Sequence, residues 1–227
     1  TPWTLPSNTA LAVGKKIDYL VVNTFNPYTY KAITVILAKA LFYKYFPEKN
    51  KDLNISEYIE GDKSIPFEII QEIKGSELEG LNYEQLLPYA QPDNGEAFRV
   101  LIGDFVTTDD GTGIVHLAPS FGADDNLVAK QNNIGSLTLV DTQGRFVDAV
   151  TDFAGMYVKN EFYSKGQAPD KSADIQIVIK LKEDNRCFKA EKYEHSYPHC
   201  WRTDKPILYY PLESWFVKTT EAKERMI

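Results

Sequence analysis

Hydrophobic residues along this chain gather in short apolar runs bounded by glycine, proline and polar residues, a pattern typical of β-strands. The runs of strand length are residues 10–13, 19–22, 67–73, 98–106, 114–117 and 187–193. The first two flank residues 14–16 and are expected to pair through that turn. Residues 137–140 and 146–149 flank Gln143 and Gly144 and predict a hairpin.

Three segments instead favour helices. Hydrophobic residues at helical spacing predict an amphipathic helix over residues 29–46, packed on the core. Short helices are expected at residues 126–131 and at residues 173–182, although the latter have a β-branched Ile-Val-Ile centre. Residues 49–63 and 91–95 are polar or turn-rich and are expected to be connections. Many short strands with few helices predict an α+β fold with a barrel-like sheet.

The stretch GTGIVHLAPSFGADD, residues 111–125, places polar side chains around a glycine-rich turn. Gly111 and Gly113 lack a Cβ, so backbone amides there can approach a ligand closely. His116 lies at the end of an apolar strand, which Pro119 then ends. The pattern indicates a ligand-binding site at the end of a strand.

Asp124 and Asp125 fall where the next helix would begin, so at least one carboxylate is available for a cationic group instead of a helix cap. On the residues alone, the same stretch is also explained by a strand, a turn and a capped helix. A neutral core histidine is likewise the ordinary alternative for His116.

Composition narrows the class of protein. The 227 residues are 43% hydrophobic, enough for a substantial core in one domain. The net charge is −7 and the 25 lysines and arginines form no basic run, so tight autonomous binding to a polyanion is not expected. No apolar run reaches the length of a membrane span. Cys187 and Cys200 could form one disulfide, but nothing in their spacing requires it, and a reducing cytoplasm is expected.

Several motifs resemble one family. Residues 111–125 are similar to the signature of the editing domain, or connective polypeptide, inserted into the class I isoleucyl-tRNA synthetases. TPWTLPSN at residues 1–8 resembles the threonine-rich segment that opens the same domain. Residues 74–89, 98–113 and 195–210 match in the same order, so the resemblance spans the chain. The sequence SFGADD at residues 120–125 resembles that of the eukaryotic-type branch of the family, which also occurs in some bacteria.

The resemblance implies a distorted β-barrel core flanked by helices, with residues 1–195 as the editing domain. Residues 196–227 would be an exit segment returning toward a catalytic domain. The H-I-G-H and K-M-S-K-S signatures of amino-acid activation are absent, so we expect an excised fragment that does not aminoacylate tRNA. Editing would need no cofactor, whereas ATP and Mg²⁺ would serve only the catalytic domain. The expected partners are tRNA(Ile) carrying valine at its 3′ end and the rest of the synthetase, with no membrane and a monomeric state.

The implied activity is post-transfer editing, the hydrolysis of valyl-tRNA(Ile) by a positioned water. One missing methylene changes binding by only about 1–3 kcal/mol, so a second sieve is required, as the handling of valine by these enzymes illustrates. The resemblance implies that His116 is part of the wall facing the substrate side chain and that Asp125 binds the α-ammonium group of the substrate. The implied catalytic residues are Thr1, Thr4, His116 and Asp125. The implied substrate-binding residues are Trp3, Asn8, Gly111, Gly113, His116, Leu117, Ala118, Asp124 and Asp125.

Alternatives remain on the sequence alone. Residues 1–8 could be only a proline-rich terminal strand, and Asp124 suits a helix cap better than a ligand. His195, His199 and Cys200 lack a fourth partner at zinc-finger spacing, so no metal site is expected. A folded tRNA- or inhibitor-binding module with a truncated first strand is the main competing function. A general esterase is disfavoured because the chain offers no GxSxG elbow.

Overall fold

The computed structural model describes residues 1–193, 196–215 and 217–222. Its strands are β1 Ala10–Val13, β2 Asp18–Phe25, β3 Ala32–Ala38, β4 Phe67–Lys74, β5 Arg99–Ile102 and β6 Ile114–Leu117. Its α-helices are α1 Phe42–Tyr45, α2 Gly75–Leu78, α3 Ala123–Gln131, α4 Ala173–Glu183 and α5 Thr219–Ala222. Its 3₁₀ helices are η1 Pro2–Ser7, η2 Lys39–Leu41, η3 Glu48–Asn50, η4 Ile55–Glu57 and η5 Asn160–Phe162.

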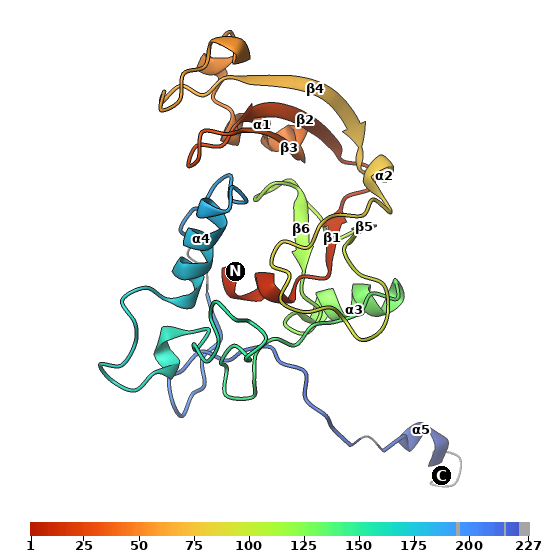
Figure 1. Ribbon diagram of the computed structural model, residues 1–227. Helices are drawn as coiled ribbons and strands as arrows, with labels where there is room; N and C mark the ends of the chain where they lie inside the picture. Colours follow the sequence, from red (N-terminus) through yellow and green to blue (C-terminus); the bar gives the residue numbers. More distant parts are fainter. Residues whose placement is uncertain (194–195, 216, 223–227) are drawn as a thin grey trace.

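The described strands form two three-stranded sheets, which Figure 1 shows as separate layers. In one sheet β1 lies between β5, to which it is parallel, and β6, to which it is antiparallel. In the other, β2 lies between β3 and β4 and is antiparallel to both. The fold is therefore α+β, as expected. The pairings among the described strands close no barrel, so the expectation of a barrel-like core is not confirmed.

The expected pairing of residues 10–13 with residues 19–22 is wrong. β1 and β2 follow each other closely in the chain, but each is the central strand of its own sheet. Tyr19, which is fully buried, ties the two sheets together, because its hydroxyl accepts from the amide of Gly14 and donates to the carbonyl of Gly113. The connection is thus a joint between layers and not a hairpin turn.

The helix expected over residues 29–46 is also wrong. Residues 32–38 of that segment form β3, which is followed by the single turns η2 and α1. Four consecutive residues, Ile33 to Ile36, are β-branched, and such side chains lose χ1 freedom in a helix but pack well on a pleated sheet. Their pairing with β2 gives the strand a tertiary partner that helical periodicity alone does not reveal.

Of the other expected elements, some are confirmed and others are not. The strands at residues 10–13, 67–73 and 114–117 are confirmed almost to the residue, and α4 confirms the helix at residues 173–182. The expected hairpin at residues 137–149 is reduced to one isolated bridge between Val140 and Phe146. The strand expected at residues 187–193 is wrong, because the chain there is irregular and no partner strand lies beside it in the described structure.

Several hydrophobic clusters hold the elements around the N-terminal segment. The cluster that includes Trp3, Phe146 and Ile177 joins η1, the irregular region near residue 146, and α4. Leu20, Phe42 and Phe67 belong to a separate cluster on the β2–β3–β4 sheet. Figure 1 shows the N-terminus between α4 and β6, in the middle of the molecule.

Two further observations bear on the expectations. Both Cys187 and Cys200 are free thiols. Within the described part of the chain, no helix combines the length and the apolar character needed to cross a membrane.

Candidate functional site

The segment expected to be a threonine-rich strand is instead the 3₁₀ helix η1. Pro2 stands at its first turn, where a missing N–H costs nothing and a fixed φ suits a helix, and Pro6 lies near its end. This turn buries Thr4 and directs its hydroxyl back to donate to the carbonyl of Thr1 (2.8 Å). Asn8 follows at the end of η1, just before β1, and is also buried.

His116 meets this segment from across the sheet. β6 is antiparallel to β1 and places His116 opposite Leu11. The Nε2 atom of His116 lies 2.9 Å from the hydroxyl oxygen of Thr4, and its Nδ1 atom lies 3.0 Å from the amide nitrogen of Asn8. Residues separated by 108 or more positions in the sequence therefore form one cluster, which we call the Thr4–Asn8–His116 cluster.

The hydrogen atoms of this cluster can be assigned by donors and acceptors. The amide nitrogen of Asn8 can only donate, so Nδ1 of His116 must accept and carries no proton. In neutral His116 the proton is then on Nε2, which donates to the hydroxyl oxygen of Thr4. The Thr4 hydroxyl proton is committed to the carbonyl of Thr1, so its oxygen keeps one further lone pair for an incoming donor.

Burial holds His116 in this neutral form. Removal from solvent lowers the pKa of His116 from 6.5 to about 4. A proton added at Nδ1 would also face the N–H of Asn8. At neutral pH His116 is therefore an uncharged hydrogen-bonding group, and in this arrangement neither ring nitrogen is available as a general base.

Asp125 lies in the first turn of α3, near the end of β6. Its Oδ2 accepts from the backbone N–H of Ala118 (2.8 Å), two residues beyond His116. Burial raises the pKa of the Asp125 carboxyl, and the backbone hydrogen bond from Ala118 opposes that change. One carboxylate oxygen is thus anchored at the end of β6. Asp124 is exposed in the same turn, and Gly122, not Asp124, is the N-cap.

The two glycines of the signature occupy different environments. Both have positive φ, 68° at Gly111 and 75° at Gly113, which favours glycine. Gly113 is buried against Ala38 at the joint between the sheets, and a Cβ there would lie 2.5 Å from the Cβ of Ala38. Gly111 is exposed, and a Cβ would meet nothing within 4 Å. Gly111 has space around its Cα, but its N–H donates to Asp110 and its carbonyl accepts from the hydroxyl of Tyr45.

Three other expected contact residues are buried. Trp3 is 3% exposed, and its ring packs edge-on against Phe121. The side chains of Leu117 and Ala118 are also buried, and their backbone groups already bond within the protein: the Leu117 carbonyl accepts from Thr9 and Asn8, and the Ala118 amide donates to Asp125. These residues shape the framework on which His116 and Asp125 stand.

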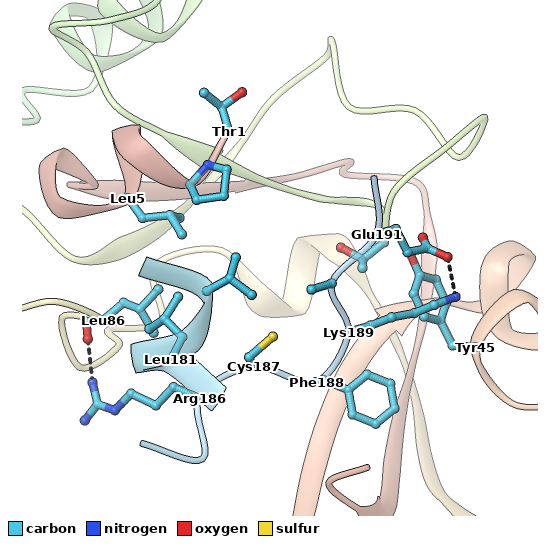
Figure 2. A pocket seen from close by; sticks show the side chains of 14 residues that line it. Thr1, Leu5, Tyr45, Leu86, Leu181, Arg186, Cys187, Phe188, Lys189 and Glu191 are labelled. Carbon is cyan, nitrogen blue, oxygen red and sulfur yellow. Dashed lines mark hydrogen bonds and ion pairs between the residues drawn. The ribbon is translucent and has the colours of Figure 1, made fainter. Parts of the chain in front are cut away.

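A cavity of about 430 Å³ opens beside Thr1. Figure 2 shows Leu86 and Leu181 on one side of it, with Lys189 paired to Glu191 on the other. His116 and Asp125 are not among the residues that line it. The sequence reasoning missed this cavity, because its walls come from η1, α4 and an irregular segment that no single motif marks.

The sequence reasoning also missed a role for Tyr83. This residue lies within the stretch KGSELEGLNYEQLLPY, which carried the family resemblance but no assigned chemistry. In the structure its hydroxyl donates to Oδ1 of Asn8 (2.6 Å) from 75 positions away. A single tyrosine in a loop produces no hydrophobic periodicity and no motif spacing, so only the fold reveals this contact.

The expectation that the chain has no metal site stays a prediction. Among the residues that the structure describes, no group of three or more His, Cys, Asp or Glu side chains is arranged to hold a metal ion. His195 lies outside the described residues. His199 instead has Nδ1 2.8 Å from the carbonyl of Tyr197.

Comparisons with known proteins give a consistent relationship. No protein-family model matches the chain. Curated isoleucine–tRNA ligases are similar along all of it: that of Cytophaga hutchinsonii is 60% identical, that of Bacteroides fragilis 50% and that of Clostridium tetani 43%. Each match covers 100% of this chain but only 22%, 22% and 18% of those proteins.

Among solved structures, "The crystal structure of GlLeuRS-CP1" is 24% identical, with a TM-score of 0.38, over 57% of this chain and 40% of that chain. A likeness at that level carries no argument about the site. The sequence matches, in contrast, show the family of the chain. By homology along its whole length, the chain belongs to the isoleucine–tRNA ligase family, in which it corresponds to a segment of about a fifth of the protein.

Proposed function

We propose that the chain is the editing domain of an isoleucine–tRNA ligase and hydrolyses the ester of valyl-tRNA(Ile). The observation that carries the proposal is the Thr4–Asn8–His116 cluster, which joins two motifs of the sequence in one hydrogen-bonded unit. The full-length similarity to isoleucine–tRNA ligases supports the same conclusion.

The cluster suits hydrolysis by water. The free lone pair of Thr4 accepts a hydrogen bond from a water molecule and thereby turns an oxygen lone pair of that water toward an ester. The ester is already an activated acyl donor, so orientation supplies much of what the reaction requires. The oxygen of the water forms the new bond to the acyl carbon, the bond between that carbon and the ribose oxygen breaks, and a proton from the water ends on the ribose oxygen, so that the tRNA hydroxyl and free valine are released.

Asp125 provides charge for recognition. Its carboxylate is fixed to the Ala118 amide and would bind the α-ammonium group of the amino acid through a charge-assisted hydrogen bond. His116, kept neutral by burial and hydrogen-bonded to Thr4 and Asn8, would form the wall that admits valine and excludes isoleucine. Neither role requires a cofactor.

The cavity beside Thr1 is the proposed entrance for the acylated end of the tRNA. Its volume lies within the range of small-molecule sites. It is lined in part by Thr1, whose carbonyl accepts the hydrogen bond from the hydroxyl of Thr4. Most of the grip on tRNA would come from the rest of the ligase, because this chain carries a net charge of −7. The exit segment, where Leu212, Trp215 and Val217 are highly exposed, would dock on that remainder.

The test is deacylation of pre-formed valyl-tRNA(Ile) by the 227-residue chain, with isoleucyl-tRNA(Ile) as the control substrate. The proposal predicts release of valine in preference to isoleucine. The same assay on the Cytophaga hutchinsonii ligase carrying this chain in place of its own segment separates a weak isolated domain from a wrong assignment. No preferential loss of valine in either form contradicts the proposal and favours a binding module.

A further inference from the structure

Tyr83 lies in the matched stretch 74–89 but had no chemical role assigned from the sequence, and it contacts the cluster through Asn8. Its hydroxyl lies 2.6 Å from Oδ1 of Asn8, an atom that can only accept, so the phenol must donate. Burial raises the pKa of Tyr83, which keeps this proton in place across the ordinary pH range. The phenol of Tyr83 is therefore a permanent hydrogen-bond donor to the buried amide of Asn8.

The position of Tyr83 is itself fixed. Its backbone N–H donates to the carbonyl of Phe98 (2.8 Å), and its ring packs edge-on against the ring of Phe98. Phe98 is in turn anchored, because its N–H donates to the carbonyl of Thr9 (2.6 Å), the residue after Asn8. Tyr83 and Asn8 are thus held on one rigid unit at the start of β1.

The amide of Asn8 has more partners than protons. Its nitrogen faces the carbonyls of Ala10 (2.9 Å) and Leu117 (3.3 Å) as well as Nδ1 of His116. Two hydrogens therefore serve three acceptors. A donor at Oδ1 polarises the amide and strengthens both N–H groups, whereas an unpartnered buried Oδ1 would favour rotation of the side chain or entry of water.

We infer that Tyr83 is a positioning residue of the proposed hydrolytic site: it holds the Asn8 amide against Nδ1 of His116, which excludes water there and keeps the ring proton on Nε2, so that Thr4 keeps a free lone pair for the attacking water. The catalytic part of this inference rests on the proposed function, but the effect on His116 does not. In the described structure Thr4 and Asn8 hydrogen-bond to His116, and the neutral phenol of Tyr83 lies behind Asn8.

The test compares Tyr83→Phe, which removes only the hydroxyl, with Tyr89→Phe, which removes a hydroxyl that bonds Asp152 instead. Ring-nitrogen NMR of the full chain follows His116, whose signals are identified by their loss in His116→Gln, because the chain has only three histidines. Single-turnover deacylation of valyl-tRNA(Ile) is measured on the same variants.

For Tyr83→Phe we expect the pKa of His116 to rise from its depressed value toward 6.5, and the deacylation rate constant to fall about fivefold with little change in KM. Tyr89→Phe changes neither. A His116 that titrates identically in the unmodified chain and in Tyr83→Phe overturns the inference. So does a proton on Nδ1 at neutral pH in the unmodified chain, a measurement that needs no variant.

The two ideas fail separately. If the unmodified chain hydrolyses no valyl ester while Tyr83→Phe still shifts the titration of His116, the proposed function is wrong and the positioning of His116 by Tyr83 stands. If hydrolysis is normal and the titration does not respond to Tyr83→Phe, the inference is wrong and the proposed function stands.

Discussion

Alanine at Gly113 or Gly111 should distinguish a glycine needed for packing between the sheets from an exposed glycine of the same signature. In Gly113→Ala the left-handed conformation costs about 1–2 kcal/mol, and overlap with Ala38 adds about 1–3 kcal/mol. The predicted loss in the free energy of unfolding is therefore about 2–5 kcal/mol. In Gly111→Ala the same backbone cost is partly offset by the lower entropy of the unfolded chain, so we expect a loss of about 1 kcal/mol.

Urea unfolding of the two variants beside the unmodified chain measures this difference, with the slope of unfolding checked for a two-state transition. The account predicts that Gly113→Ala is clearly the less stable of the pair. If Gly111→Ala loses deacylation although its stability falls only by this small amount, Gly111 faces the substrate. Equal losses of stability in the two variants would refute the proposed packing of Gly113 at the joint between the sheets.

Three further predictions concern the site. The pKa of His116 falls from 6.5 to about 4 on folding, so the unfolded chain binds more protons between these pH values. The free energy of unfolding should therefore decrease by up to about 3 kcal/mol as the pH drops through that window. Urea unfolding of His116→Gln at the same pH values should lack this contribution. Asp125→Asn keeps an acceptor for the Ala118 amide but loses the charge, so deacylation should fall at least about tenfold at unchanged Tm, and activity within twofold of normal would remove Asp125 from the site. His116→Ala should raise the rate for isoleucyl-tRNA(Ile) relative to valyl-tRNA(Ile), and an unaltered ratio in competing deacylations would make His116 a framework residue only.

The sequence predicted those parts of the fold in which local pattern and tertiary packing agree. Residues 114–117 and 173–182 show this, because an apolar run and a helical periodicity found partners that suit them. Residues 29–46 show the opposite. Their periodicity fits a helix, but pairing with β2 and a β-branched run favour a strand, and neither sheet partner nor layer order can be inferred from spacing.

The candidate site divides in the same way. Thr4, Asn8 and His116 could be named from motifs, and the structure brings them into contact. The cavity beside Thr1 and the contact of Tyr83 with Asn8 could not be predicted, because they depend on which distant segments pack around η1. The burial of Trp3 was equally hidden, since a tryptophan within a binding motif suits a core as well as a pocket.

The central claim is that the hydroxyl of Thr4, oriented by His116, positions the water that hydrolyses a valyl ester. Thr4→Val removes this hydroxyl at nearly constant shape, whereas Thr4→Ser retains it. Single-turnover deacylation of valyl-tRNA(Ile) by both variants measures the contribution directly. The account predicts a loss of at least about tenfold in Thr4→Val, equivalent to one lost hydrogen bond in the transition state, and a much smaller loss in Thr4→Ser. A Thr4→Val chain that deacylates as fast as the unmodified chain would contradict it.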